Sequence, residues 1–259
     1  MNFGTFGLPQ NLGTASGLLG LPDISGNSLK KQLQSKVFIG WSGNSTISDI
    51  SGLQGISVAG NVQSSIVKVG SNAFAYTGGN NSLIGQRLND NLKRLKSYTI
   101  SCWCRWNSFN YAGCWGMWGG VTSNWDETTG IQVNCSNTGS SPSKLSFNIW
   151  DGISGNPTGG YMVSSSFLSI NTWYHFIFEI GDNYIKLYVN GNQEGTPVHF
   201  SPNLDLWTNA QIFRLAGYEL GSSSVQLNGY LDEFYILKGV LNTAEIAYLY
   251  NNNNGNTLV

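Results

Sequence analysis

Nine consecutive residues, Tyr98-Thr-Ile-Ser-Cys-Trp-Cys-Arg-Trp106, indicate the fold more clearly than any other part of the chain. Every second position, from Tyr98 to Trp106, holds an aromatic, aliphatic or cysteine side chain. The positions between them hold Thr99, Ser101, Trp103 and Arg105. Successive side chains of a β-strand point to opposite faces of its sheet. The pattern therefore predicts a strand with one face in a hydrophobic core and a second face that is partly polar.

Further strands are predicted after this segment at fairly even spacing. The chain turns over residues 107–112 and returns as a strand at 113–120. Later strands are expected at 145–150, 173–178, 184–189, 211–215 and 229–237. Turns rich in Gly, Asn and Ser separate them, and Asn190-Gly191 has the composition of a tight hairpin loop. The whole predicts an all-β protein built as a two-sheet antiparallel jelly-roll sandwich.

One short helix is predicted near the C-terminus. Asn242 is a suitable N-cap, and Glu245 follows three residues later, as a capping box requires. The apolar stripe consists of Ile246, Leu249 and Tyr250. The helix is expected to end in the asparagine-rich run that precedes Gly255.

Six segments carry motifs that occur together, in this order, in one fold family. They are residues 73–79, Tyr98-Thr-Ile-Ser-Cys-Trp-Cys104, Asn171-Thr-Trp-Tyr-His-Phe-Ile-Phe178, Ile185-Lys-Leu-Tyr-Val-Asn-Gly191, Leu227-Asn-Gly-Tyr-Leu-Asp-Glu-Phe-Tyr-Ile236 and the helix at 241–250. They resemble the strands and closing helix of the laminin-G-like (LamG) domain of the concanavalin A-like lectin/glucanase superfamily. The resemblance implies a concanavalin A-like jelly roll and a lectin-like function.

This resemblance divides the chain into three parts: an N-terminal segment at 1–70, the sandwich at 71–251 and an asparagine-rich tail at 252–259. Residues 1–35 are rich in Gly and Leu without a helical period, which predicts an extended arm. Short strands are expected between residues 36 and 70, at 37–39 and 66–69 among others. We expect this segment to serve attachment or oligomerisation, and the chain to form a homo-oligomer.

Several polar and sulfur-containing residues are expected to be structural. His175 shares a strand face with Trp173 and is more typical of a hydrogen-bonded structural histidine than of a base. Asp232 and Glu233 are adjacent, so they are expected on opposite faces, with Asp232 accepting backbone hydrogen bonds. Buried free thiols are the first interpretation of the cysteines, which are Cys102, Cys104, Cys114 and Cys135. A Cys104–Cys114 disulfide across a hairpin is the alternative.

The sequence carries no recognisable catalytic motif. Glycoside hydrolysis with retention requires two carboxylates about 5–5.5 Å apart. In hydrolases that this chain resembles, they come from one strand that reads Glu-x-Asp-x-x-Glu, and no such stretch occurs here. Neither a nucleophile elbow nor a phosphate-binding loop is present. A glycoside hydrolase is therefore disfavoured, and we expect a protein that is not an enzyme.

Sugar binding relies on flat aromatic rings and on directional hydrogen bonds, and a few loops and strand faces carry both. The candidate carbohydrate-binding residues are Trp125, Asp126, Trp150, Asp151, Trp103 and Arg105. A tryptophan that seals the edge of the sandwich is the alternative interpretation for each tryptophan. The clustered oxygens of Asp126, Glu127 and Asp151 form a weak candidate site for calcium. No other cofactor is expected.

The amino-acid composition limits the kinds of partner that are expected to bind this chain. Only 10% of residues are charged, against about 25% in an ordinary domain, and the net charge is −1. Such a chain offers no basic field for nucleic acid. No apolar run is long enough for a membrane-spanning helix, and the N-terminus has no signal-peptide pattern.

These features lead to two functional hypotheses. The first is a lectin-like surface protein of a virus or phage particle, located on the virion or extracellular after lysis. It would bind a glycan or cell-surface polysaccharide and contact other virion subunits through residues 1–70. The second is a purely structural virion protein that uses the jelly roll for protein packing.

Overall fold

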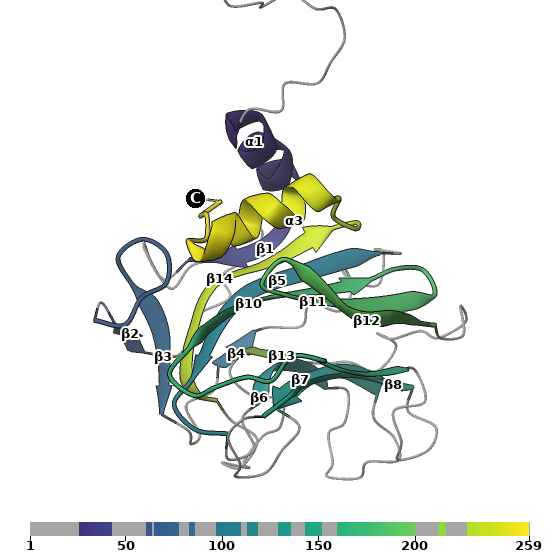
Figure 1. Ribbon diagram of the computed structural model, residues 1–259, viewed down its shortest axis with the longest axis horizontal. Coiled ribbons are helices and arrows are strands. Elements are labelled where there is room, and N and C mark those ends of the chain that lie inside the picture. Colours follow the sequence, from purple (N-terminus) through teal and green to yellow (C-terminus); the bar gives the residue numbers. More distant parts are fainter. Residues whose placement is uncertain are drawn as a thin grey trace, which may run out of the picture.

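The computed structural model describes two antiparallel sheets that face each other, with two helices on the outside of one sheet (Figure 1). This confirms the predicted two-sheet sandwich with a short C-terminal helix. The described residues are 26–42, 61–63, 65–77, 83–85, 97–109, 113–118, 129–135, 143–151, 160–199, 212–215 and 227–258. Within these ranges, no helix is both long and apolar enough to cross a membrane.

The larger sheet contains eight of the described strands, and we call it sheet A. Seven run in the order β12-β11-β10-β5-β14-β3-β2, and β1 also pairs with β14. Their bounds are β1 Val37–Trp41, β2 Asn61–Gln63, β3 Ala73–Thr77, β5 Tyr98–Trp106, β10 Trp173–Ile180, β11 Tyr184–Val189, β12 Asn192–His199 and β14 Asn228–Lys238. Strand β5 lies between β10 and β14.

The smaller sheet, sheet B, has six described strands in the order β4-β13-β6-β7-β8-β9. Their bounds are β4 Leu83–Gly85, β6 Gly113–Trp118, β7 Thr129–Cys135, β8 Leu145–Asp151, β9 Gly160–Val163 and β13 Ile212–Leu215. The two sheets enclose a hydrophobic core to which both contribute. Phe147 of sheet B meets Phe178 of sheet A edge-on, with ring centroids 5.2 Å apart. Complete burial of one such side chain stabilises the fold by about 1.5–3 kcal/mol.

A second, smaller core lies on the outer face of sheet A, beneath α1 (Gly26–Lys36) and α3 (Thr243–Tyr250). Leu33 of α1 and Ile246 and Leu249 of α3 pack there against Ile177 and Tyr235 of the sheet. The chain then makes a short 3-10 helix, η3 (Asn251–Asn253), and its last described residues lie against the same face. Figure 1 shows both helices on this side of the molecule.

The predicted capping box of α3 is confirmed. The Asn242 side chain accepts from the Glu245 amide, and the Glu245 carboxylate accepts from the Asn242 amide, both at 2.9 Å. Asn251 ends the helix with a φ of 45°, in the left-handed region that asparagine tolerates better than most residues. The predicted hairpin loop is confirmed as well, since Asn190 and Gly191 both have positive φ.

The N-terminal segment differs from the prediction in its described parts. Residues 26–36 form α1 instead of an extended arm, because the burial of Leu33 and contacts with α3 stabilise a helix with little apolar character of its own. Strand β1 is part of sheet A, paired from Val37↔Leu237 to Trp41↔Phe234, so 37–41 belong to the sandwich. Residues 66–69 form bends and not the expected strand. Residues 1–25 lie outside the described part.

Cys102, Cys104 and Cys135 are buried free thiols. The alternative disulfide between Cys104 and Cys114 is therefore wrong, and the first interpretation is confirmed for these three residues. Burial raises the pKa of the Cys135 thiol, which keeps that side chain neutral. The side chain of Cys114 lies outside the described part.

Candidate functional site

The outer face of sheet A carries two neighbouring rows of functional side chains. Strands β10, β5 and β14 lie side by side, and directly paired residues of antiparallel strands point to the same face. One row joins His175, Trp103 and Asp232; we call it the covered row. The next joins Trp173, Arg105 and Tyr230; we call it the open row. The two rows differ sharply in their exposure to solvent.

The covered row lies beneath the C-terminal helix and the chain that follows it. Trp103 is only 1% exposed. The Tyr250 ring stacks on it at 6.0 Å between centroids, and the Lys68 ammonium lies 4.2 Å from the centre of its ring. A side chain at Gly255 would lie 3.0 Å from the Trp103 indole nitrogen, so the tail passes close over the ring. Trp103 does lie on the outer face, but its ring is covered and cannot stack on a ligand. Its prediction as a carbohydrate-binding residue is therefore corrected.

His175 is buried in the same row and has a structural role. Its Nε2 lies 3.0 Å from the Ser101 hydroxyl, and its ring contacts Trp103 with centroids 4.9 Å apart. Burial, together with the positive charge of Lys68, lowers the pKa of His175 to about 3. The imidazole is therefore neutral at physiological pH and is not suited to shuttle protons there.

A bulge in β14 corrects the predicted placement of Asp232 and Glu233. Pairing with β5 shifts between Asp232 and Tyr235, and Glu233 has a φ of 45°. Asp232 accepts from the backbone amides of Lys68 and Val69 at 3.1 and 3.0 Å, as predicted for it. Glu233, however, accepts from the hydroxyls of Ser42 and Tyr235. The bulge thus places Tyr235 on the same outer face as Asp232, whereas residues three apart in a regular strand point to opposite faces, and Glu233 is bonded to Tyr235 on that side.

Burial has a strong effect on the first of these carboxyls. Asp232 is 0% exposed, and desolvation raises its pKa to about 7 against the opposing effect of its backbone donors. Glu233 is buried as well, and desolvation raises its pKa. Both carboxyls are held by hydrogen bonds within the fold and are closed to solvent. Neither is available as a surface ligand.

The open row lies just beyond the cover and is half-buried. Tyr230 contacts both other side chains, with the Trp173 ring centroid 6.3 Å and the Arg105 guanidinium carbon 5.3 Å from its ring centre. These separations are typical of aromatic and cation–π contacts. The three side chains therefore form one continuous surface of two aromatic rings and a planar cation.

Asparagines at the end of the sheet hold the cation of this row in place. Arg105 donates to the side-chain oxygen of Asn107 at 3.2 Å and to that of Asn171 at 3.0 Å. Asn171 has a φ of 60° and its backbone amide donates to the Trp106 carbonyl at 2.7 Å. Asn228 is bonded in turn to the Asn107 amide. Because the asparagines are themselves anchored to the strands, the guanidinium is oriented before any ligand arrives.

Among the predicted binding residues whose side chains are described, Arg105 alone lies on the surface of the open row. Trp125, Asp126 and Glu127 lie outside the described residues. Trp150 and Asp151 occupy the end of β8, where they pair with Gly130 and Thr129, and their side chains lie outside the described part. Their proposed roles remain predictions.

The predicted calcium site also lies outside the described side chains. Among the side chains that the structure describes, no group of three or more His, Cys, Asp or Glu is arranged to hold a metal ion. The three candidate ligands, Asp126, Glu127 and Asp151, all lie beyond those side chains. Calcium therefore stays a prediction.

Sequence reasoning missed Trp173, Tyr230 and Asn171 as members of the site. Alternation alone places Arg105 on the face of its strand that points away from the core, and places Trp173 on the same strand face as His175. It does not reveal that β10 and β14 flank β5, or which residues pair across them. The register Trp173↔Arg105↔Tyr230 is fixed by tertiary structure and supplies the missing information.

Comparisons with known proteins agree with this architecture. A family model described as "Concanavalin A-like lectin/glucanases superfamily" matches residues 58–247. No sequence among curated proteins matches the chain significantly.

Several solved structures share the fold. Domain 4 of AbnA, an extracellular arabinanase from Geobacillus stearothermophilus solved with arabinotriose, is 17% identical with a TM-score of 0.56; the match covers 82% of this chain and 96% of that one. The ligand-binding domain of botulinum neurotoxin serotype D, solved with N-acetylneuraminic acid, is 16% identical with a TM-score of 0.58; the match covers 86% of this chain and 52% of that one. Thus the chain spans about half of the neurotoxin structure. At these identities the likeness shows the fold alone.

Proposed function

Because the chain belongs to the concanavalin A-like lectin/glucanase superfamily, we propose that it is a non-catalytic carbohydrate-binding protein whose ligand lies across the open row. The observation that carries this proposal is the alignment of Trp173, Arg105 and Tyr230 over three adjacent strands, outside the cover of α3 and the tail. A sugar ring presents C–H groups on its faces and hydroxyls on its rim. The open row offers aromatic faces for the former and, with its asparagines, polar groups for the latter.

The rigidity of this surface supports a binding role. The row stands on the three central strands of sheet A, and β5 lies between two partners along most of its length. A site on paired strands loses little conformational entropy when a ligand binds. Exposed Asn171 and Thr172 lie directly beside Trp173 and supply further hydrogen-bonding groups at the edge.

The proposal of a protein without catalytic activity rests on the described carboxylates. Six acidic side chains lie in the described part of the chain, and five of them are buried and hydrogen-bonded within the fold: Glu179, Glu194, Asp232, Glu233 and Glu245. Carboxylates engaged in this way are poorly placed to protonate a leaving group or to attack a sugar. The sixth, Asp182, lies in the turn between β10 and β11.

The ligands of two structural neighbours support a glycan as the class of ligand. One neighbour was solved with arabinotriose and another with N-acetylneuraminic acid. We carry over only the class of ligand to this chain, because the identities are low. Neither neighbour's sugar is proposed as the specific ligand here.

Attachment to a virus or phage particle remains the narrower part of the proposal. Helix α1 is fixed to the outer face of sheet A by Leu33 and by an ion pair between Lys36 and Glu245. The described chain therefore begins, at Gly26, on the side of that face. A virion subunit bound on this side of the sandwich would leave Trp173 and Tyr230 on the uncovered part of the sheet.

A glycan-array screen of the purified chain tests the proposal, with and without millimolar calcium. The variants to compare are Trp173→Ala, Tyr230→Ala and the double variant Trp125→Ala, Trp150→Ala. Loss of binding in the first two, with an unchanged melting temperature, would support the open row. Loss only in the double variant would place the site in the loops that the sequence suggested. A folded chain that binds no glycan would overturn the proposed function.

A further inference from the structure

We infer that the open row selects acidic saccharides, with a sugar carboxylate bound by Arg105 and the adjoining ring stacked on Trp173 or Tyr230. This inference rests on the proposed function and specifies its ligand class. It goes beyond that function because aromatic stacking alone would accept neutral sugars equally well.

The first argument is the state of charge of Arg105. Its guanidinium donates to the amide oxygens of Asn107 and Asn171, which are neutral acceptors. The ion pairs recorded among the described residues are Lys36–Glu245 and Lys186–Glu179, and neither involves Arg105. The guanidinium is thus oriented without being neutralised.

The second argument is the unused hydrogen-bonding capacity of the guanidinium. It has five N–H donors in a planar fork, and the two asparagines accept one bond from each terminal nitrogen. The remaining donors can approach a carboxylate, which accepts two parallel bonds from such a fork. The side chain is half-buried and not enclosed, so a surface ligand can reach it.

The third argument is the charge of the neighbouring residues. The carboxyl in the adjacent row, Asp232, is 0% exposed and turned to the backbone amides of Lys68 and Val69. Lys68 itself is a second cation on this face, over the Trp103 ring. A carboxylate on the open row would therefore meet Arg105, with the Lys68 charge in the adjacent covered row and no described surface anion beside it to repel it.

The decisive experiment compares acidic glycans with neutral partners of the same backbone. The probes are oligogalacturonate and its carboxyl-reduced form, together with sialylated glycans and their desialylated forms. Affinity is measured by titration calorimetry at low and high salt, using the full chain. We expect at least one acidic probe to bind about tenfold more tightly than its neutral partner, with a preference that weakens as salt increases.

Three variants assign any preference to Arg105. Arg105→Met retains much of the apolar stem but removes the charge, and is expected to abolish the preference. Asn171→Asp is nearly isosteric at a position whose positive φ both residues tolerate, and its carboxylate would pair with Arg105 and compete with the ligand. It is therefore also expected to lose the preference. Lys238→Met removes an exposed cation at the other end of β14, roughly 25 Å from Tyr230, and should change nothing.

The outcomes separate this inference from the proposed function. Equal affinity for acidic and neutral partners would overturn the acidic selectivity and leave carbohydrate binding intact. A preference that survives in both Arg105→Met and Asn171→Asp, or that is lost in Lys238→Met, would also overturn it. A folded chain that binds no probe of either kind would overturn both.

Discussion

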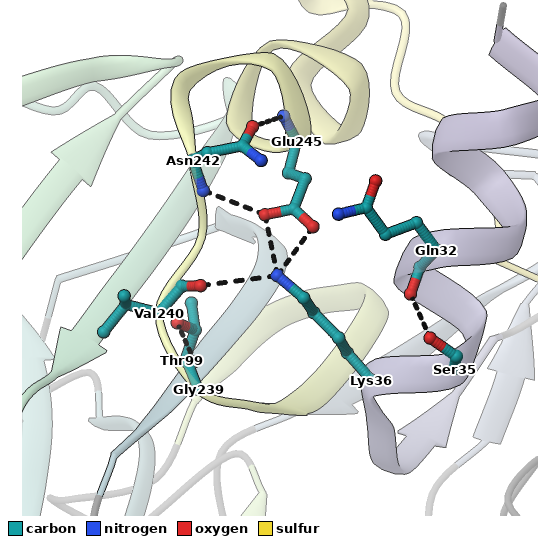
Figure 2. Close-up of polar contacts among 8 residues, drawn as sticks. All are labelled: Gln32, Ser35, Lys36, Thr99, Gly239, Val240, Asn242 and Glu245. Carbon is teal, nitrogen blue, oxygen red and sulfur yellow. Dashed lines mark hydrogen bonds and ion pairs between the residues drawn. The ribbon is translucent and has the colours of Figure 1, made fainter. Parts of the chain in front are cut away.

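Replacing Lys36 by methionine is expected to destabilise the chain more than replacing its ion-pair partner Glu245 by glutamine. Figure 2 shows the Lys36 ammonium between the Glu245 carboxylate and the Val240 carbonyl. The ammonium lies 2.6 Å from Oε1 of Glu245 and donates to Oε2 at 2.9 Å. The same carboxylate also accepts from the Asn242 amide in the capping box. One buried group thus stabilises the start of α3 and joins it to α1.

The magnitudes follow from the difference in exposure between the two partners. The Lys36 side chain is 26% exposed, whereas that of Glu245 is 0% exposed. Glu245→Gln leaves a partly solvated ammonium and a side chain that can still cap the helix, so it should cost about 1 kcal/mol. Lys36→Met leaves a buried carboxylate without its cation, which should cost about 3 kcal/mol. The double variant removes that unpaired charge and should be more stable than Lys36→Met alone.

Urea unfolding at neutral pH, followed by circular dichroism, measures these free energies for the wild type, both single variants and the double variant. Lys31→Met provides the control, because Lys31 is exposed on the same helix and its replacement should change the stability little. The reasoning would be refuted if Glu245→Gln cost as much as Lys36→Met, or if the double variant were the least stable.

Two further predictions concern the site and its support. Burial raises the pKa of Asp232 from 3.8 to about 7, so this carboxyl contributes stability at low pH that is lost as the pH rises through about 7. Burial lowers the pKa of His175 from 6.5 to about 3, so this imidazole contributes stability at high pH that is lost as the pH falls. The His175→Asn variant keeps Asp232, so its stability should fall from pH 4 to 6.5; the Asp232→Asn variant keeps His175, so its stability should rise over the same range. Each change should reach up to about 1.4 kcal/mol per pH unit. Melting temperatures that change in the same direction with pH in both variants would contradict this. Gly229→Ala should lose several kcal/mol of stability in urea unfolding, because its new methyl group would lie 2.0 Å from the Arg105 carbonyl oxygen. The control Gly239→Ala, in open space with a φ of 74°, should cost about 1 kcal/mol. Similar losses in both variants would contradict the importance of the close approach at Gly229.

The sequence predicted those elements whose local signals agree with their tertiary environment. Strand β5 alternates along its whole length and has one face in the core, and α3 has a complete capping box. Helix α1 was missed because its only fully buried side chain is Leu33, so its stability comes from docking rather than from an amphipathic pattern. Strand β12 was missed because Gly195 and Pro197 interrupt it at the edge of the sheet.

The site was less predictable than the fold because it depends on register. Arg105 could be assigned to the outer face from alternation, but its neighbours come from β10 and β14, far away in sequence. Which outer-face residues remain uncovered depends on where α3 and the tail pack, and this distinguishes Arg105 from Trp103. The bulge at Glu233 likewise has no clear local signal, since a positive φ at glutamate is uncommon.

The most direct test of the central claim is an NMR titration that follows the tryptophan indole N–H signals. The signals of Trp173, Trp103, Trp125 and Trp150 are assigned by single Trp→Phe variants, and the tightest ligand from the array is then added to the wild type. We predict that the Trp173 indole signal shifts in proportion to saturation while that of Trp103 stays unchanged beneath its cover. A shift of the Trp125 or Trp150 signal with Trp173 unaffected would contradict the account and move the binding site to the loops.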